Sequence, residues 1–84
     1  MYYVYILRNI NDKSDFYLGY TSDIERRIFE HNIGKNKSTK NKEWELVYYE
    51  SYTTINAARK REYRLKHDGR VKKYLMDRIK EDLK

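Results

Sequence analysis

Tyrosine, arginine and glutamate side chains stand at positions in this sequence that could serve phosphodiester cleavage. The tyrosines occupy two short β-type segments, residues 3–5 (Tyr-Val-Tyr) and 17–19 (Tyr-Leu-Gly), and Arg27 and Glu62 lie in two later helix-like stretches. Phenols, a guanidinium and one carboxylate could together activate water, neutralise phosphate oxygens and hold one metal ion. Tyrosine is also a good strand former, so a purely structural role stays open. Ten tyrosines against two phenylalanines favour the chemical interpretation.

Length and composition place these residues in one small domain. A chain of 84 residues has room for a single core, so we expect one domain over residues 1–84. Cysteine is absent, and no apolar stretch approaches the roughly 20 residues of a membrane span. We therefore expect a cytoplasmic protein with no membrane partner.

The charge distribution favours a polyanionic partner. The net charge is +6, and acidic and basic residues nearly balance in residues 1–34. Two later clusters therefore carry the excess positive charge. They are Lys35, Lys37, Lys40 and Lys42, and then Arg59, Lys60, Arg61, Arg64 and Lys66. Such clusters commonly meet phosphate backbones, although they could also be a well-solvated surface. Gly19 is either a bulge or a point where another group approaches the backbone closely. The expected nucleic-acid contacts are Gly19, Lys35, Lys37, Lys40, Lys42, Arg59 and Arg61.

The pattern of apolar residues predicts three strands and three helices. Unbroken β-branched and aromatic runs predict strands over residues 2–7, 16–20 and 43–51. Apolar residues at helical spacing predict helices over residues 23–32, from Thr53 or Thr54 to a break at Asp68, and over 71–83. We expect an α/β fold of the α+β type: a small three-stranded antiparallel sheet flanked by three helices, in the order β-β-α-β-α-α.

Local signals add detail to this arrangement. Ser22 and Glu25 have the spacing of a capping box. Residues 9–15 predict a long hairpin loop, and residues 35–42 predict a mobile loop too polar to bury. Alternate residues of the first strand should face opposite sides of the sheet, with Tyr3, Tyr5 and Leu7 on one face and Tyr2, Val4 and Ile6 on the other.

Glu62 is the sharpest anomaly, because it falls in the apolar stripe of the second helix between Ala58 and Leu65. A carboxylate facing a core is costly unless it is paired, hydrogen-bonded or bound to metal. A structural ion pair with Arg27 or a neighbouring arginine is the alternative. His31 lies one turn after Arg27, and could act in proton transfer or be a helix-end histidine stabilised by the dipole.

Taken in order, these segments resemble a stand-alone GIY-YIG nuclease domain, similar to the N-terminal module of UvrC-type excision nucleases and to small bacterial single-domain members of that superfamily. The resemblance runs from Tyr2 to about Leu83. It rests on segments 3–5 and 17–19, on Asp-Ile-Glu-Arg-Arg at 23–27 with His-Asn at 31–32, on Trp-Glu-Leu-Val-Tyr at 44–48, and on Arg-Glu at 61–62 with Leu-Lys at 65–66. One departure is that Tyr3 replaces the glycine that opens the family name.

The resemblance implies a metal-dependent endonuclease that hydrolyses phosphodiester bonds in nucleic acid, with DNA as the expected substrate and repair or processing as the expected role. It implies that Glu62 holds one Mg²⁺ or Mn²⁺, that Tyr5 helps to deprotonate water, and that Arg27 clamps the phosphate. Tyr17 would orient the water or a phosphate oxygen, and His31 would support proton transfer or contact the phosphate.

Two other functions stay open on the sequence. The first is a nucleic-acid-binding module that cleaves nothing by itself and depends on a protein partner for specificity. The second is a subunit that docks on an acidic protein. A monomer and a weak homodimer both suit the sequence, and no element that reads bases is evident.

Overall fold

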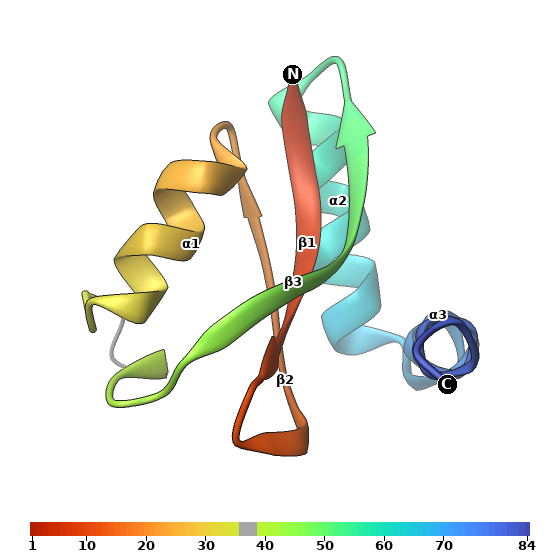
Figure 1. Cartoon of the computed structure of the whole chain (residues 1–84). Helices are drawn as coiled ribbons and strands as arrows, with labels where there is room; N and C mark the ends of the chain where they lie inside the picture. The colour runs from red at the N-terminus through yellow and green to blue at the C-terminus, as the bar shows by residue number, and fades with distance from the viewer. Residues whose placement is uncertain (36–38) are drawn as a thin grey trace.

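Three strands and three helices build the computed structural model, which describes residues 1–35 and 39–84 (Figure 1). The elements are β1 (Tyr2–Asn9), β2 (Asp12–Thr21), α1 (Ile24–Asn32), β3 (Trp44–Tyr52), α2 (Ile55–His67) and α3 (Gly69–Asp82). The α+β class, the antiparallel sheet and the order β-β-α-β-α-α that the sequence predicted are confirmed. None of the helices in the described residues has the length and apolar character needed to cross a membrane.

The sheet has the order β2-β1-β3, and β1 pairs antiparallel with both neighbours. The prediction of a long hairpin loop over residues 9–15 is wrong, because β2 already begins at Asp12. The Asn9 side-chain oxygen accepts a hydrogen bond from the Asn11 amide at 2.9 Å and closes a tight turn. The polar residues that follow pair as an exposed strand end rather than forming a loop.

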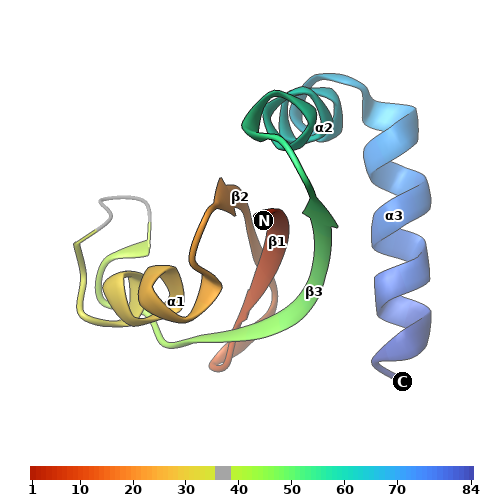
Figure 2. The ribbon, with the colours of Figure 1, turned by 90° about the horizontal axis from the view of Figure 1, so that it is seen from above.

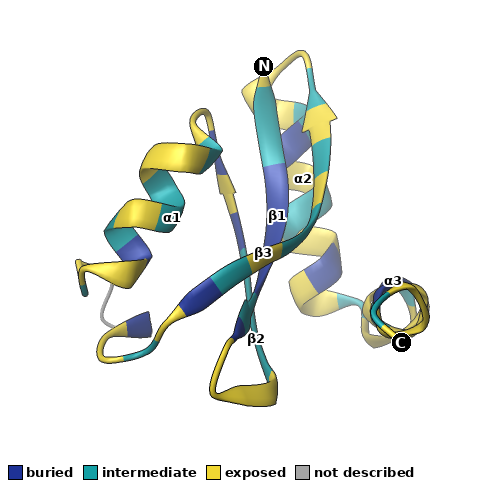
Figure 3. Cartoon of the chain, in the orientation of Figure 1, coloured by how far each residue is buried: buried dark blue, intermediate teal, exposed yellow. Residues whose placement is uncertain are grey.

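The sheet separates two cores, as Figure 2 shows with α1 on one side and α2 and α3 on the other. Tyr5 and Leu7 of β1 pack with Trp44 on the α1 side, whereas Val4 and Ile6 belong to the core beneath α2 and α3. The predicted alternation of the first strand is therefore confirmed at these four positions. Figure 3 shows a run of buried positions on β1, and Tyr5 is one of four consecutive buried residues there.

Side chains cap all three helices. Asp23, rather than the predicted Ser22, is the N-cap of α1, and its carboxylate accepts from the Arg26 amide at 3.1 Å. Thr54 caps α2. Asp68 ends α2 and accepts from the first amides of α3, so the predicted break at Asp68 is confirmed.

A carboxylate clamp fixes α2 against β3. Arg61 donates two hydrogen bonds to Glu50, each at 2.9 Å, and the hydroxyls of Tyr48 and Tyr52 donate to the same carboxylate. This network holds the rotation of α2 about its axis. Glu62, the next residue, lies about 100° further around the helix and lines a cavity together with residues of β2 and α1.

Candidate active site

Four elements contribute side chains to one open cavity of about 480 Å³. Tyr5 comes from β1, Tyr17 and Gly19 from β2, Arg27 from α1 and Glu62 from α2. The cavity is completed by Tyr2, Tyr20, Thr21, Ser22, Arg26, Glu30 and Ile55. Residues far apart in the sequence, and predicted as separate parts of one site, thus share a single solvent-accessible space.

Tyr5 begins a buried chain of hydrogen bonds. Its hydroxyl lies 2.8 Å from Nε2 of His31, and Nδ1 of His31 lies 2.8 Å from the Thr39 hydroxyl. His31 and Thr39 are both fully buried. The expectation that the whole polar segment 35–42 cannot be buried is therefore wrong at Thr39, because its side chain finds a partner inside. The indole of Trp44 donates to the Thr39 carbonyl at 3.1 Å and holds this residue in place.

His31 joins Tyr5 to Thr39 through its two ring nitrogens. A neutral imidazole has one donor nitrogen and one acceptor nitrogen. In the tautomer with the proton on Nδ1, His31 donates to the Thr39 hydroxyl and Nε2 accepts from the Tyr5 hydroxyl. This tautomer would place His31 to receive the Tyr5 proton.

Burial controls the charge of both groups. Desolvation lowers the pKa of His31 to about 4, helped by the nearby Arg27 charge, so the imidazole is neutral at physiological pH. Desolvation raises the pKa of Tyr5 to about 12, although the hydrogen bond from Arg27 acts in the opposite direction. A Tyr5 phenolate therefore forms only when something further stabilises it or takes up its proton.

The lowered pKa of His31 predicts that the stability of the fold depends on pH. Between about pH 4 and 6.5 the unfolded chain binds a proton that folded His31 does not, so the free energy of unfolding should rise with pH across that window. The full effect is roughly 3 kcal/mol, at about 1.4 kcal/mol for each pKa unit. Urea melts should show the rise in wild type and in His67→Gln, and should show a flatter profile in His31→Gln. An unchanged slope in His31→Gln would assign the dependence to other groups.

Arg27 is half-buried and bound on its own helix. Its Nη1 lies 3.1 Å from Glu30, and this hydrogen bond raises the pKa of Arg27 against the opposing effect of burial. The guanidinium therefore stays charged beside Tyr5. It presents a fixed positive group to an anion that enters the cavity.

Glu62 forms an ion pair, but not with an arginine. Its carboxylate lies 3.1 Å from the Lys66 ammonium one turn later, and its side chain is only 15% exposed. The alternative of a structural pair with Arg27 or a neighbouring arginine is therefore wrong, because Arg27 binds Glu30 and Arg61 binds Glu50. Lys66 has a long, flexible side chain that is partly exposed, and such surface ion pairs are weak. Another cation can therefore displace Lys66 from Glu62.

Glu62, as a single carboxylate ligand beside an open cavity, suits one hard divalent cation. In residues 1–35 and 39–84 no three His, Asp or Glu residues cluster as ligands. Mg²⁺ commonly accepts one or two carboxylates and fills its remaining positions with water and substrate phosphate oxygens. The open cavity beside Glu62 leaves space for those ligands, so the site fits a metal shared between protein, water and substrate.

Gly19 lies against Tyr5, and this contact predicts a large effect of a single methyl group. A Cβ at position 19 would lie 2.6 Å from the Tyr5 hydroxyl oxygen and 2.8 Å from Cζ of that ring. Tyr5 is fully buried and held by His31, so it cannot move aside freely. We expect Gly19→Ala to cost about 1–3 kcal/mol of stability and most activity. Gly69→Ala is the matched control because a Cβ there meets nothing within 4 Å, and equal melting of both variants would contradict the argument.

The basic residues predicted to contact nucleic acid do not share one environment. Lys35, Lys40 and Arg59 are exposed, and Arg59 lines a hollow beside Glu62. Lys42 pairs with Asp15 at 2.9 Å, and Arg61 is tied to Glu50. Lys37 lies outside the described residues. The exposed residues are available to a phosphate backbone, whereas Lys42 and Arg61 have carboxylate partners already.

Comparison with known proteins agrees with the fold and the cavity. Residues 1–75 match the family model of the GIY-YIG catalytic domain. The chain therefore belongs to the GIY-YIG superfamily. It is 46% identical over 77 residues to a UPF0213 protein of Staphylococcus epidermidis, a match that covers 89% of this chain and 92% of that protein. A UPF0213 protein of Haloquadratum walsbyi is 43% identical over 74 residues, a match that covers 86% of this chain and 81% of that protein. No solved structure gives a significant match.

Sequence reasoning did not identify three residues that shape the site. Thr39 hydrogen-bonds Nδ1 of His31, Trp44 holds Thr39, and Glu30 positions Arg27. Glu30 could have been found from its spacing of three residues from Arg27 on one helix. Thr39 carries no such signal, because a threonine among lysines and asparagines is typical of a surface loop.

Proposed function

We propose that residues 1–84 act as one nuclease domain that hydrolyses phosphodiester bonds in nucleic acid with a divalent metal ion, and that DNA is the substrate. The observation that carries the proposal is the Tyr5 hydroxyl, which lies between His31 and Arg27 in the cavity that also holds Glu62. The family supports the nuclease class. The proposal includes action in the cytoplasm, in DNA repair or processing, by a monomer or weak homodimer.

Tyr5 and His31 are proposed to move the proton of the attacking water. Tyr5 gives its hydroxyl proton to Nε2 of neutral His31 and takes one from the water, while Arg27 stabilises the developing phenolate. In the tautomer that this relay uses, Nδ1 of His31 donates to Thr39 and Nε2 is the acceptor that faces Tyr5. Because the pKa of His31 is about 4 and that of Tyr5 about 12, the transfer is uphill by itself, so the relay needs the Arg27 charge and a metal ion that would lower the pKa of the attacking water.

Arg27 and Glu62 are proposed to handle the phosphate charge. Arg27 can pair with a non-bridging oxygen because its guanidinium faces the cavity and stays charged. Glu62 would hold the Mg²⁺ or Mn²⁺, which supplies Lewis-acid neutralisation of the phosphate. Tyr17 lines the same cavity, with its ring centroid 4.6 Å from that of His31, and is proposed to orient the water or a phosphate oxygen.

Cleavage of labelled substrates tests the proposal directly. The panel is single-stranded, duplex, flapped and branched DNA together with RNA, each with Mg²⁺ or Mn²⁺ and with EDTA. We expect wild type to cut only when metal is present. The substrates that are cut should show which shape of nucleic acid the protein prefers. If no substrate is cut while nucleic acid is still bound, the nuclease proposal fails and a binding module takes its place.

The second candidate is a nucleic-acid-binding module that needs a partner for cleavage. The pairing of Glu62 with Lys66 favours it, because metal binding must first displace this lysine. Both candidates predict binding through phosphate contacts that weaken with salt. With duplex DNA, Arg59→Ala should reduce the slope of log affinity against log salt by about 0.9, the value for one contact. Arg70→Ala, at an exposed position on α3, should leave the slope unchanged, and an equal loss in both variants would contradict the predicted surface.

A further inference from the structure

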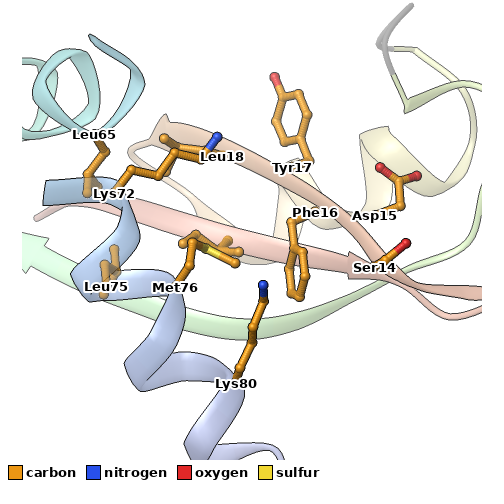
Figure 4. Close-up of a pocket in the computed structure, with 11 residues that line it drawn as sticks. Ser14, Asp15, Phe16, Tyr17, Leu18, Leu65, Lys72, Leu75, Met76 and Lys80 are labelled. Carbon is orange, nitrogen blue, oxygen red and sulfur yellow. The ribbon is translucent and has the colours of Figure 1, made fainter. Parts of the chain in front are cut away.

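A second groove lies on the opposite side of the sheet, between β2 and α3 (Figure 4). It has a volume of about 350 Å³, and residues 14–18 of β2 form one continuous wall. Phe16, Leu18 and Met76 point toward one another in this groove, whereas Tyr17 points away (Figure 4). The groove thus combines apolar side chains along one strand with polar and charged residues in the rest of its lining.

The strand that forms this wall is at the edge of the sheet. In the order β2-β1-β3, β2 pairs with β1 alone among the described strands. Natural edge strands are usually shielded by charged residues, and β2 has these at Asp12, Lys13 and Asp15. Residues 16–20, Phe-Tyr-Leu-Gly-Tyr, carry no charge. The backbone of this part can therefore accept another strand.

Two lysines of α3 give the groove a charge preference. Lys72 and Lys80 line it, and the Lys80 ammonium lies 6.0 Å from the centre of the Phe16 ring. In residues 1–35 and 39–84 no carboxylate lies within 4.0 Å of either ammonium, whereas neighbouring Lys73 pairs with Asp77 at 2.9 Å. Asp15 of the groove is already paired with Lys42. The uncompensated charge in the groove is positive.

We propose that this groove binds an extended segment of a partner protein, which adds a strand to the outer edge of β2, the edge that faces away from β1. Strand addition supplies backbone hydrogen bonds, and the groove selects alternate side chains. Residues two apart share a face of a strand. The segment therefore has an apolar residue that packs between Phe16, Leu18 and Met76, with acidic residues two positions to either side, beside Lys72 and Lys80. This inference does not rest on nuclease activity.

The test uses a defined probe: a blocked heptapeptide with a central leucine, a glutamate two residues to either side, and threonine elsewhere. Titration into the labelled protein, followed by amide NMR, should give saturable shifts in residues 14–18 of β2 and in α3. The double variant Lys72→Glu with Lys80→Glu should bind about tenfold more weakly, because two favourable charge pairs become repulsive. Lys60→Glu on α2 is the matched control and should bind as wild type does.

Two altered probes separate the alternatives. A peptide with lysine in place of both glutamates should not bind, and one with N-methylated amides on its pairing edge should lose most affinity. Equal binding of the N-methylated peptide would mean that the groove captures a small amphipathic anion without strand pairing, and would overturn the proposal. Absence of shifts in residues 14–18, or equal binding of the lysine peptide, would overturn it as well.

Discussion

Replacing Glu62 with glutamine is expected to lower metal-dependent cleavage about a hundred- to a thousandfold and to leave the fold intact. Glutamine keeps the size of the side chain but removes the charge that would hold a divalent cation, and loss of one electrostatic stabiliser of a transition state commonly costs a hundred- to a thousandfold. The lost ion pair with Lys66 is worth only about 0.3–0.5 kcal/mol for residues four apart on a helix. Cleavage rates in Mg²⁺ and thermal melts by circular dichroism measure both effects.

Lys66→Ala is the matched control for this variant, since it removes the same ion pair from its other end. If Glu62 acts through metal, Lys66→Ala should keep or increase activity at limiting Mg²⁺, because the carboxylate has lost its competing partner. Loss of folding in Glu62→Gln would assign the carboxylate a structural role. Retention of cleavage in Glu62→Gln would remove it from the mechanism.

The sequence predicted the sheet and its two faces because local periodicity carries that information. Val4 and Ile6 alternate with Tyr5 and Leu7 along β1. Because alternate residues of a strand face opposite sides of the sheet, the first pair lies in one core and the second pair in the other. Helical spacing likewise revealed Glu62 as a carboxylate in an apolar stripe. It could not reveal the carboxylate's partner, because several cations lie within reach of one helix turn and side-chain conformation chooses among them.

The roles of individual side chains depended on contacts that no local pattern encodes. Tyr5 and His31 are 26 residues apart in the sequence, and their hydrogen bond arises only when α1 packs on the sheet. Arg61 looked like a phosphate contact because its neighbours are basic, yet its guanidinium donates two hydrogen bonds to Glu50 of β3. Charge clusters therefore predict the kind of partner better than they predict which lysine or arginine contacts it.

Tyr5→Phe is expected to reduce cleavage about a hundred- to ten-thousandfold, the range for loss of a general acid or base. Phenylalanine fills the same buried space but cannot accept the water proton or pass one to His31. It also leaves Nε2 of buried His31 without its hydroxyl partner, which should cost about 1–3 kcal/mol of stability. Cleavage rates should therefore be measured well below the melting temperature of the variant.

Tyr20→Phe provides the control, because Tyr20 lines the same cavity but is more exposed, and its loss should change the rate only severalfold. The pH profile distinguishes chemistry from packing. A relay through neutral His31 predicts wild-type activity that declines as the pH falls toward the His31 pKa of about 4, provided that the protein stays folded. His31→Gln should lower the rate across the whole range, because glutamine cannot take up the Tyr5 proton. If Tyr5→Phe cleaves at nearly the wild-type rate, the phenol serves the core alone and another group must activate the water.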